Sequence, residues 1–455
     1  MTALTQNFVR RLFRLPETAT DSPINQITTD SRTAQRGDLF FALVGENHDA
    51  HDFVPDVLAK GATAVVSRGD CTSFSGCLKV DDTLAALQTL AAAWRKQLNP
   101  FVYGITGSSG KTTVKEMLAT ILREAHGADA VLATAGNFNN HIGLPLTLLN
   151  LRGHHRYAVI EMGMNHAGEL AMLTRIAAPN VALVNNAMRA HIGCGFNGVD
   201  DIARAKAEIY QGLPENGIAI LPAEDAHLAI FQAAAGAFQT LTFGVATGDV
   251  HAENIALEPL ASAFDLVYHH QRQAVQLPVA GKHNISNACA AAALAIAGGL
   301  GQPEIARGLA AFSNIKGRLQ RKNGIRQALI LDDTYNANPD SMRAAIDVLA
   351  DQPAPRLLVM GDMGETGAQA EAFHREVGEY AVSRAIEQVW AVGKDMKAAA
   401  QAGGVQHWET VEALLAEHLQ APAGIASILV KGSRFMKMER VVRAWVDMAS
   451  PQGEH

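Results

Sequence analysis

The stretch Gly104-Ile105-Thr106-Gly107-Ser108-Ser109-Gly110-Lys111-Thr112-Thr113 decides how this chain folds. An apolar run, 101–103, precedes it and an amphipathic segment, 114–123, follows it, so the order predicts a strand, a glycine-rich turn and a helix. Glycines let backbone N–H groups close around an anion, and the N-terminus of a helix adds a positive field at the same place. The stretch therefore predicts a nucleoside triphosphate site.

The residues of this turn have distinct expected parts in holding ATP. Lys111 can reach the β- and γ-phosphates, and the Thr112 hydroxyl can ligate Mg²⁺. Further contacts to ATP are expected from the rest of the turn and the start of the helix: Gly107, Ser108, Ser109, Gly110 and Thr113. The usual pattern has a glycine where this chain has Ile105. A chance Gly-Lys-Thr in a loop is the alternative, which the flanking strand and helix disfavour.

Length and composition are typical of a soluble globular enzyme with several domains. The 455 residues are enough for about three domains of roughly 150 residues each. A hydrophobic content of 48% with 18% charged residues fits large buried cores. The net charge is −7 and no dense Lys/Arg run occurs, which disfavours nucleic acid as a partner. Anionic ligands must therefore be held by local sites such as the predicted phosphate loop.

The cysteines and the first residues of the chain predict a cytoplasmic location. Cys71, Cys77, Cys194 and Cys289 form no C-x-x-C pair and no zinc spacing, so reduced thiols are expected. The first residues lack a basic region followed by an apolar core, so no secretory signal is expected. The longest apolar stretch, 288–300, is too short to span a bilayer, and no integral membrane segment is expected.

Three blocks of strands and helices predict an α/β protein with three domains. We place these domains at residues 1–98, 99–314 and 315–455. The first boundary lies just before Pro100, because proline disfavours helix in the residue that precedes it. The first block mixes short strands with helices, and it stands ahead of the strand that leads into the predicted phosphate loop.

The second and third blocks alternate strands with segments long enough for crossover helices. In the second block this alternation predicts a mostly parallel sheet, with an antiparallel hairpin added within 250–280. The third block predicts a sheet like that of dinucleotide-binding folds, and its last helix is expected at 434–448.

Two residues that follow predicted strands are candidates for catalysis or metal binding. Glu161 ends the apolar strand 157–160, and a phosphate loop needs a carboxylate nearby to position Mg²⁺. His191 follows the strand 181–184, in a loop whose glycines would let it close over a substrate. The alternatives are a solvated charge for Glu161 and a structural role for His191, and the residues by themselves leave both open.

Polar residues nearer the C-terminus are further candidates. Asn284 and Asn287 open a predicted helix and suit an adenine edge, although a pair of helix-capping amides explains them equally well. Arg318 stands at the start of the third block, where a guanidinium can reach phosphates. Asp333 follows a strand in a polar segment, for which a simple turn is the alternative. Lys206 lies on a helix with an apolar face, and spacing alone assigns it no role.

Taken in this order, the segments resemble the Mur ligase family. The matching segments span all three blocks: 106–113, 136–140, 161–163, 190–193, 205–208, Asn284 with Asn287, 317–318 and 333–339. The displaced first glycine is itself the family's form of the loop.

Within the family, the resemblance is strongest to the ligases that add D-alanyl-D-alanine to UDP-N-acetylmuramoyl-tripeptide. The segments that carry it are 333–342, 361–365 and 430–434. The signature of the family's N-terminal domain includes Asp30-Ser31-Arg32. One position departs from the family turn, which has Leu where this chain has Thr366.

The resemblance implies a domain for each part of the reaction. It implies an N-terminal domain that holds the UDP end of the substrate, a central ATPase domain, and a C-terminal Rossmann-like domain that closes over the nucleotide. The implied substrate contacts are Ser31 and Arg32 at the uridine diphosphate, Asn139 and Asn140 at the muramoyl-peptide, and Asn336 and Asn338 at the incoming dipeptide. The implied ATP contacts outside the loop are Asn284 and Asn287 near adenine, Arg318 at phosphate and Asp333 near the ribose.

The resemblance also implies a role for Lys206 and a set of catalytic residues. Similar lysines are carbamylated by CO₂, and the resulting carboxylate would help Thr112, Glu161 and His191 to hold Mg²⁺. The implied catalytic residues are Lys111, Glu161, His191 and Lys206. The implied activity is ADP-forming ligation of an acid to an amino acid or peptide in the cytoplasmic stage of peptidoglycan synthesis. The expected partners are small-molecule substrates, and we expect a monomer.

Three other assignments compete with this one. The first is another ligase on the same scaffold, either a different Mur ligase or an enzyme like folylpolyglutamate synthase. About 100 residues precede the phosphate loop, which argues against the folate enzyme, whose loop lies near its N-terminus. The second is a kinase with the same loop, which would release ADP but no free phosphate. The third is a nucleotide-gated binding module without catalysis, which the presence of Lys111, Thr112, Glu161 and His191 disfavours.

Overall fold

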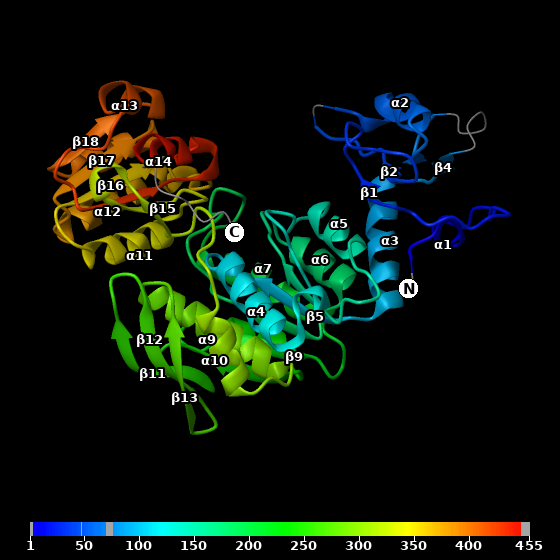
Figure 1. Cartoon of the computed structure of the whole chain (residues 1–455), viewed down its shortest axis with the longest axis horizontal. Helices are drawn as coiled ribbons and strands as arrows, with labels where there is room; N and C mark the ends of the chain where they lie inside the picture. The colour runs from blue at the N-terminus through cyan, green and yellow to red at the C-terminus, as the bar shows by residue number, and fades with distance from the viewer. Residues whose placement is uncertain (1–2, 47, 70–75, 447–455) are drawn as a thin grey trace.

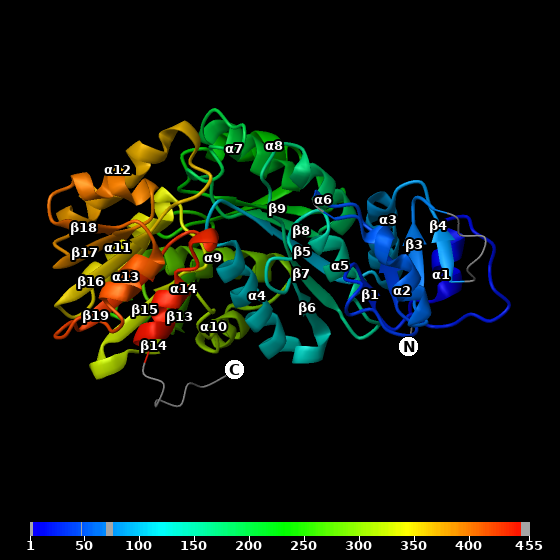
Figure 2. The same ribbon diagram turned by 90° about the horizontal axis from the view of Figure 1, so that it is seen from above.

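The computed structural model describes residues 3–46, 48–69 and 76–446 and places them in three domains, each with its own sheet (Figure 1). The central domain lies between the other two, and the chain enters it from the N-terminal domain through one long helix (Figures 1 and 2). This arrangement confirms the predicted α/β fold class.

The N-terminal domain is a small parallel sheet of order β1-β2-β3-β4. Phe40 packs with α2 on one face of the sheet, whereas Phe41 packs with α3 on the other. The helix α3 ends at Asn99, which takes the left-handed conformation. The bounds are β1 Ile27–Thr28, β2 Leu39–Phe41, β3 Thr63–Val66, β4 Cys77–Lys79, α1 Gln6–Leu12, α2 Val54–Ala59 and α3 Thr83–Leu98.

The central domain is a nine-stranded sheet of order β13-β12-β11-β10-β9-β8-β5-β7-β6. Its strands are β5 Phe101–Thr106, β6 Val131–Ala133, β7 Tyr157–Glu161, β8 Val181–Val184, β9 Ile218–Pro222, β10 Gln239–Phe243, β11 Val250–Leu257, β12 Ser262–Tyr268 and β13 Gln271–Leu277. The pairs from β6 to β11 are parallel, and β11, β12 and β13 are antiparallel. Both sequence predictions for this block are confirmed. The patterns missed β10 and β11, because neither is a continuous apolar run.

Helices cover both faces of the central sheet (Figure 2). One face packs against α4 Lys111–His126, α9 Lys282–Ala297 and α10 Gln302–Ala310. The other packs against α5 Gly143–Leu149, α6 Glu169–Ala177, α7 Val199–Ala207 and α8 Leu228–Ala235. Side chains alternate between the faces along β5, where Val102 joins one core and Tyr103 the other. The loops at the carboxyl ends of the strands are thereby held at one edge of a rigid sheet.

The C-terminal domain is a six-stranded sheet of order β14-β15-β19-β16-β17-β18, parallel except for the β14–β15 pair. Its elements are β14 Gln320–Asn323, β15 Leu329–Asp333, β16 Arg356–Gly361, β17 Gln388–Val392, β18 Val405–Trp408, β19 Ser427–Lys431, α11 Pro339–Ala350, α12 Ala370–Ser383, α13 Val411–Glu417 and α14 Glu439–Trp445. The prediction of one helix over 434–448 is wrong, because Lys437 takes a left-handed conformation that separates 434–436 from α14. Residues 447 and 448 lie outside the described residues.

The cysteines differ in part from the expectation of reduced thiols. Cys77 is disulfide-bonded, so the expectation is wrong for this residue. Cys194 and Cys289 are free, as expected, and Cys71 lies outside the described residues. In the described part of the chain, no helix combines the length and apolar character needed to cross a membrane.

A test of the central packing is Gly308→Ala in α10. An added Cβ would lie 2.4 Å from the Cα of Ile121 in α4, where backbone cannot move aside easily. Helix propensity favours alanine by about 1 kcal/mol, but crowding in a packed core costs typically about 1–3 kcal/mol. The difference is about 0–2 kcal/mol, and because the clash at 2.4 Å is with backbone, we expect a net loss in its upper half, about 1–2 kcal/mol, in denaturant unfolding followed by circular dichroism. Gly403→Ala, with no atom within 4 Å of the added carbon, is the control; equal stability of the two variants would contradict the close contact.

Candidate active site

The turn between β5 and α4 leaves no room for a side chain at Gly107 or Gly110. Gly107 has φ 155° and Gly110 has φ 78°, both in the region that favours glycine. A Cβ on Gly110 would lie 2.3 Å from Oδ1 of Asn287 and 2.5 Å from Nδ2 of Asn185. The turn opens α4 without a side-chain cap, so the first N–H groups of this helix have no capping side chain and are suited to an anion.

Two asparagines that the sequence analysis missed hold this turn in place. Asn185 Nδ2 donates to the carbonyl of Ser109 (2.9 Å), and the Ser109 N–H donates to Asn186 Oδ1 (2.9 Å). The backbone N–H of Ser108 donates to the carbonyl of Asn186 (3.1 Å). Both asparagines directly follow β8, at the same sheet edge as the phosphate loop, and this position after a buried strand is the signal that was available.

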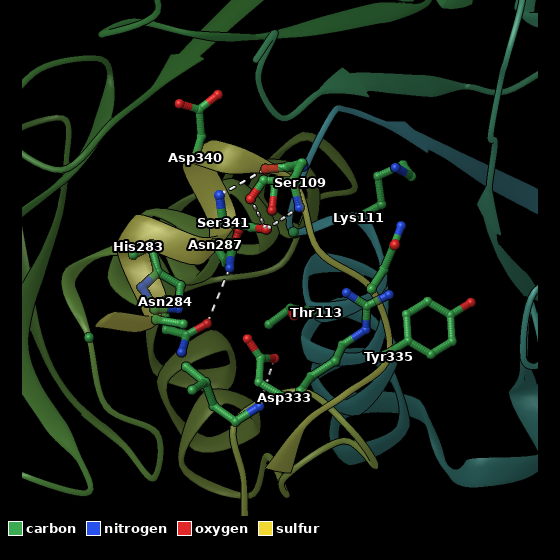
Figure 3. A pocket seen from close by; sticks show the side chains of 18 of the residues that line it. Ser109, Lys111, Thr113, His283, Asn284, Asn287, Asp333, Tyr335, Asp340 and Ser341 are labelled. Carbon is green, nitrogen blue, oxygen red and sulfur yellow. Dashed lines mark hydrogen bonds between the residues drawn. The ribbon is translucent and has the colours of Figure 1, made fainter. Parts of the chain in front are cut away.

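Asn284 and Asn287 lie at the start of α9 and face the same turn. Asn185 Nδ2 donates to Asn287 Oδ1 (3.1 Å), and Asn287 Nδ2 donates to Asn284 Oδ1 (3.2 Å). Asn284 Nδ2 donates to the carbonyl of Ala280 (2.8 Å). The N-cap of α9 is Gly281, which has no side-chain cap, so the two amides are not its helix cap. Figure 3 shows them around one pocket with Ser109, Lys111 and Asp333.

A buried carboxylate lies beside the first turn of α4. Glu161 is 3% exposed; its Oε2 accepts from the Thr112 hydroxyl (2.8 Å) and its Oε1 from Asn139 Nδ2 (2.9 Å). Arg318 Nη2 donates to the same Thr112 oxygen (2.8 Å) across the domain boundary. Burial excludes a solvated strand-end charge for Glu161. No Lys, Arg or His forms an ion pair with it in the described chain.

Two lysines with lowered pKa belong to this part of the site, Lys111 partly exposed at the cavity and Lys206 fully buried. Lys111 Nζ donates to the carbonyl of Gly107 (2.7 Å), and burial lowers the pKa of Lys111, opposed by the charge of Glu161. Lys206 in α7 is 1% exposed. Burial and then the charge of Lys111 lower the pKa of Lys206 well below its ordinary value. Its ammonium has neither a hydrogen bond nor an ion pair among residues 3–46, 48–69 and 76–446.

His191 meets the C-terminal domain through Glu365. Their Nδ1 and Oε2 atoms are 2.6 Å apart. Burial lowers the pKa of His191, against the effect of Glu365, and the histidine holds the pKa of the Glu365 carboxyl below its usual range. The Gly193 N–H donates to the Glu365 carbonyl (2.9 Å), and Gly193 packs on Gly367 so closely that a Cβ on Gly193 would lie 2.7 Å from the Gly367 nitrogen. The turn with the unusual Thr366 therefore forms part of the domain contact.

The C-terminal domain brings a second set of predicted residues to the site. Arg318 stacks over Tyr335 at 4.4 Å, and Asp333 accepts from Lys431 Nζ (2.6 Å) and from the N–H of Leu319 (3.1 Å). The Asn336 side chain accepts from the N–H of Ala337 (2.9 Å), and Asn338 is the N-cap of α11, where it accepts from Ser341 N (2.8 Å). The role of Asn338 in capping is thus a structural one that the sequence analysis did not assign.

A cavity of about 940 Å³ lies between the central and C-terminal domains. The predicted residues that line it are Ser108, Ser109, Gly110, Lys111, Thr113, Asn139, Asn140, Glu161, His191, Asn284, Asn287, Arg318, Asp333, Asn336 and Asn338. Gly107, Thr112 and Lys206 are not among the residues that line it. Ser31 and Arg32 belong to the N-terminal domain and are not brought to the cavity; Arg32 pairs with Asp30 (2.6 Å), and Lys60 donates to the Ser31 carbonyl (2.8 Å).

An α/β domain with a closed phosphate loop, a buried carboxylate on its threonine and a second domain across the cavity defines a P-loop nucleotide-binding enzyme. Three family descriptions match successive parts of the chain: "Mur ligase family, catalytic domain" at 23–100, "Mur ligase middle domain" at 105–295 and "Mur ligase, glutamate ligase domain" at 317–434. The chain belongs to the Mur ligase family, and it is an ATP-dependent ligase.

Individual relatives are similar over nearly the whole chain. The UDP-N-acetylmuramoyl-tripeptide–D-alanyl-D-alanine ligase of Escherichia coli is 44% identical over 429 residues, which are 93% of this chain and 94% of that protein. The crystal structure of MurF from Acinetobacter baumannii has a TM-score of 0.88 at 39% identity, covering 96% of this chain and 97% of that one. MurF from Thermotoga maritima, in complex with ADP, has a TM-score of 0.82 at 27% identity, covering 92% and 96%.

A test of the closed turn is Gly110→Ala. The new carbon would collide with the amides of Asn185 and Asn287, and φ 78° strains any L-residue. We expect the Kd for ATP, measured by calorimetry, to rise at least ~10-fold, which is about 1.4 kcal/mol. Gly198→Ala, where no atom lies within 4 Å and the backbone is extended, should bind ATP as the wild type does. An unchanged Kd in Gly110→Ala would contradict the tight turn.

Proposed function

We propose that this chain joins D-alanyl-D-alanine to UDP-N-acetylmuramoyl-tripeptide at the expense of ATP. The observation that carries the proposal is the closed phosphate loop with Thr112 on the buried Glu161, in a cavity completed by Arg318 and Asp333 of the C-terminal domain. The printed name of the E. coli relative supplies the substrates. The 44% identity to a relative of this name does not favour the rival assignments to another Mur ligase or to an enzyme like folylpolyglutamate synthase.

The reaction has two steps that balance in atoms and charge. A carboxylate oxygen of the tripeptide attacks the γ-phosphorus of ATP, and ADP leaves with the electrons of the broken P–O bond. The acyl phosphate formed is a mixed anhydride with a good leaving group. The amine of D-alanyl-D-alanine then attacks the acyl carbon, loses a proton and expels orthophosphate, which leaves the amide. Both steps place negative charge on oxygens, so fixed positive groups lower both barriers.

The chain's own residues supply most of this electrostatic stabilisation. Lys111 lies at the loop with a lowered pKa and no carboxylate partner within ion-pair distance, so a bound triphosphate would be its natural counter-charge. Arg318 reaches the same place from the C-terminal domain. Fixed donors of this kind contribute on the order of 3 kcal/mol each to transition-state stabilisation. The C-terminal domain, which covers the cavity, would also exclude water that could otherwise hydrolyse the acyl phosphate.

The residues at the loop fit Mg²⁺. The buried Glu161 carboxylate has hydrogen-bond donors but no cationic partner within ion-pair distance in the described residues, a costly arrangement that a bound cation would relieve. We propose that Thr112, Glu161, His191 and a modified Lys206 hold the metal. Thr112, Glu161 and the carbamate would supply oxygen ligands, which suit this ion, and His191 a nitrogen. The ion, when bound, would neutralise charge on the phosphate oxygens.

Lys206 fits carbamylation for a separate reason. Its lowered pKa favours the neutral amine over the ammonium, and the neutral amine can attack CO₂ and release a proton to give a carbamate. The product is a carboxylate facing Lys111, so the modification replaces repulsion by attraction.

The remaining assignments extend this proposal to the rest of the chain. We propose domains at 1–98, 99–314 and 315–455, with a cytoplasmic monomer as the working form. Ser31 and Arg32 bind the uridine diphosphate end of the substrate, and Asn139 and Asn140 contact its muramoyl-peptide. Asn336 and Asn338 face the dipeptide, and Asn338 is also the cap of α11. Asn284 and Asn287 lie at adenine.

The whole proposal is tested by orthophosphate release with ATP, UDP-N-acetylmuramoyl-tripeptide and D-alanyl-D-alanine, omitting each in turn. We expect release only when all three are present. Release that does not need the dipeptide would refute the ligase assignment, and formation of ADP without phosphate would favour a kinase.

Replacing the loop lysine tests its catalytic part. Lys111→Ala should lower kcat at least ~100-fold without unfolding the protein, because it removes a fixed charge from both transition states. The exposed Lys96→Ala in α3 is the matched control and should retain full turnover. Near-normal turnover in Lys111→Ala would remove this residue from the mechanism.

Replacing the buried lysine tests the carbamate. We expect a carbamate carbonyl signal in ¹³C NMR of the wild type in ¹³C-bicarbonate, and its absence in Lys206→Met, which keeps the volume of the side chain. Lys206→Ala should lose most of its activity. Full activity of Lys206→Ala at low bicarbonate would contradict the proposed role.

A further inference from the structure

Arg189 extends from the central domain into the C-terminal domain. It lies in the loop between β8 and α7, and its guanidinium binds two carboxylates on different helices. Asp340 in the first turn of α11 accepts from Nη2 (2.6 Å), Nε (3.1 Å) and the backbone N–H of Arg189 (2.9 Å). Glu376 of α12 accepts from Nη1 (2.6 Å) and Nη2 (3.0 Å). The same guanidinium lies over the Phe373 ring at 5.2 Å.

This set of contacts depends on the shape of an arginine. The planar fork satisfies two carboxylates at once, whereas a lysine ammonium would hold either one as a point charge. The side chain is 25% exposed, so these bonds are partly shielded from water. Arg189 holds the pKa of the Glu376 carboxyl below its usual range, in agreement with the short distances.

The segment that carries Arg189 also holds the phosphate loop. Asn185 and Asn186 bind Ser109, and the Met188 N–H donates to the Ser108 hydroxyl (2.9 Å). Arg189 follows directly, so a short stretch of chain connects the turn around the phosphates to α11. The neighbours on either side of Arg189, Met188 and Ala190, line the cavity, but Arg189 itself does not.

The helix α11 spans the cavity and is held to the central domain near both ends. Its first turn carries Asp340, which binds Arg189 and belongs to the cavity lining, where Figure 3 labels it. Just past its last turn, Gln352 Nε2 donates to the carbonyl of Pro259 (2.6 Å), in the turn between β11 and β12. The contact at Pro259 does not involve Arg189, so it would remain if the contact at Asp340 were lost, together with the contacts of Glu365 described above. The Asp340 contact is thus the one that fixes the first turn of α11.

We propose that Arg189 is a positioning residue that sets the orientation of the C-terminal domain over the phosphate loop. It touches neither the cavity nor the reacting atoms. By holding α11, it keeps Arg318 and the loop 333–338 opposite Lys111, and it makes this orientation depend on the conformation of the phosphate loop. The inference rests on the proposed function only where turnover is the readout.

The experiment compares Arg189→Met with Arg343→Met in the full-length protein. Arg343 is the matched control, because it donates to the same Glu376 (2.9 Å) and stacks on Tyr380 but stays within the C-terminal domain. Small-angle X-ray scattering is recorded with magnesium and a non-hydrolysable ATP analogue. Arg189→Met should have a larger radius of gyration than the wild type, and Arg343→Met should not.

Kinetics of orthophosphate release supply the second readout. We expect kcat of Arg189→Met to fall on the order of 10- to 100-fold, as for a misplaced reacting group, with the KM for ATP within about threefold of wild type. The kcat of Arg189→Lys should lie between those of the wild type and Arg189→Met. The kcat of Asp340→Asn should fall as much as that of Arg189→Met. Thermal unfolding verifies that each variant is folded. If Arg189→Met does not fold, Asp340→Asn serves as the test in its place.

Unchanged scattering and unchanged kcat in both Arg189→Met and Asp340→Asn would overturn the inference. A lower kcat with unchanged scattering would also overturn it, because the effect would then be local. The scattering needs no peptide substrate. Failure of the ligase assignment would abolish wild-type turnover but leave the expected change in scattering, so the two failures are distinguishable.

Discussion

The site depends on the absence of a Cβ at Gly107 and Gly110, the two ends of the phosphate loop. At Gly110, the place that a Cβ would take is occupied by amides of Asn185 and Asn287, which come from the loop after β8 and from α9. A parallel sheet brings these segments to one edge, because the carboxyl ends of its strands meet there. The turn is therefore fixed by its neighbours before an anion binds, and its N–H groups need little reorganisation when one does.

Several of the charged groups around this turn are not neutralised by partners within the described protein, so bound ligands would complete them. Desolvation lowers the pKa of Lys111 and of Lys206, and the charge of Lys111 lowers the pKa of Lys206 further, while Glu161 is buried without an ion-pair partner in the described chain. In a low dielectric such groups are costly when uncompensated. A triphosphate, a metal ion and a carbamate would each offset one of these costs. This is a physical reason why the proposed ligands and modification belong together in one cavity.

The division of the site between two domains follows from the proposed chemistry. An acyl phosphate must form out of contact with water, yet two large substrates must enter and leave, so the cavity has to open and close. The C-terminal domain contributes Arg318, Asp333 and Glu365 to the cavity. Arg318 contacts Thr112 and Glu365 contacts His191 only when this domain lies against the central domain. Contacts near both ends of α11 restrict how they come together.

The sequence by itself determined the phosphate loop, most strands of the three sheets, and candidates such as Glu161 and His191 at strand ends, because apolar runs and glycine turns are local patterns. The tertiary structure alone decided which loops face one another. It brought Asn185 and Asn186 into contact with the phosphate loop and Arg189 into contact with α11. It also made Asn338 a helix cap and left Ser31 and Arg32 away from the cavity. Contacts between distant segments depend on strand order and domain orientation, which no local pattern of one chain encodes.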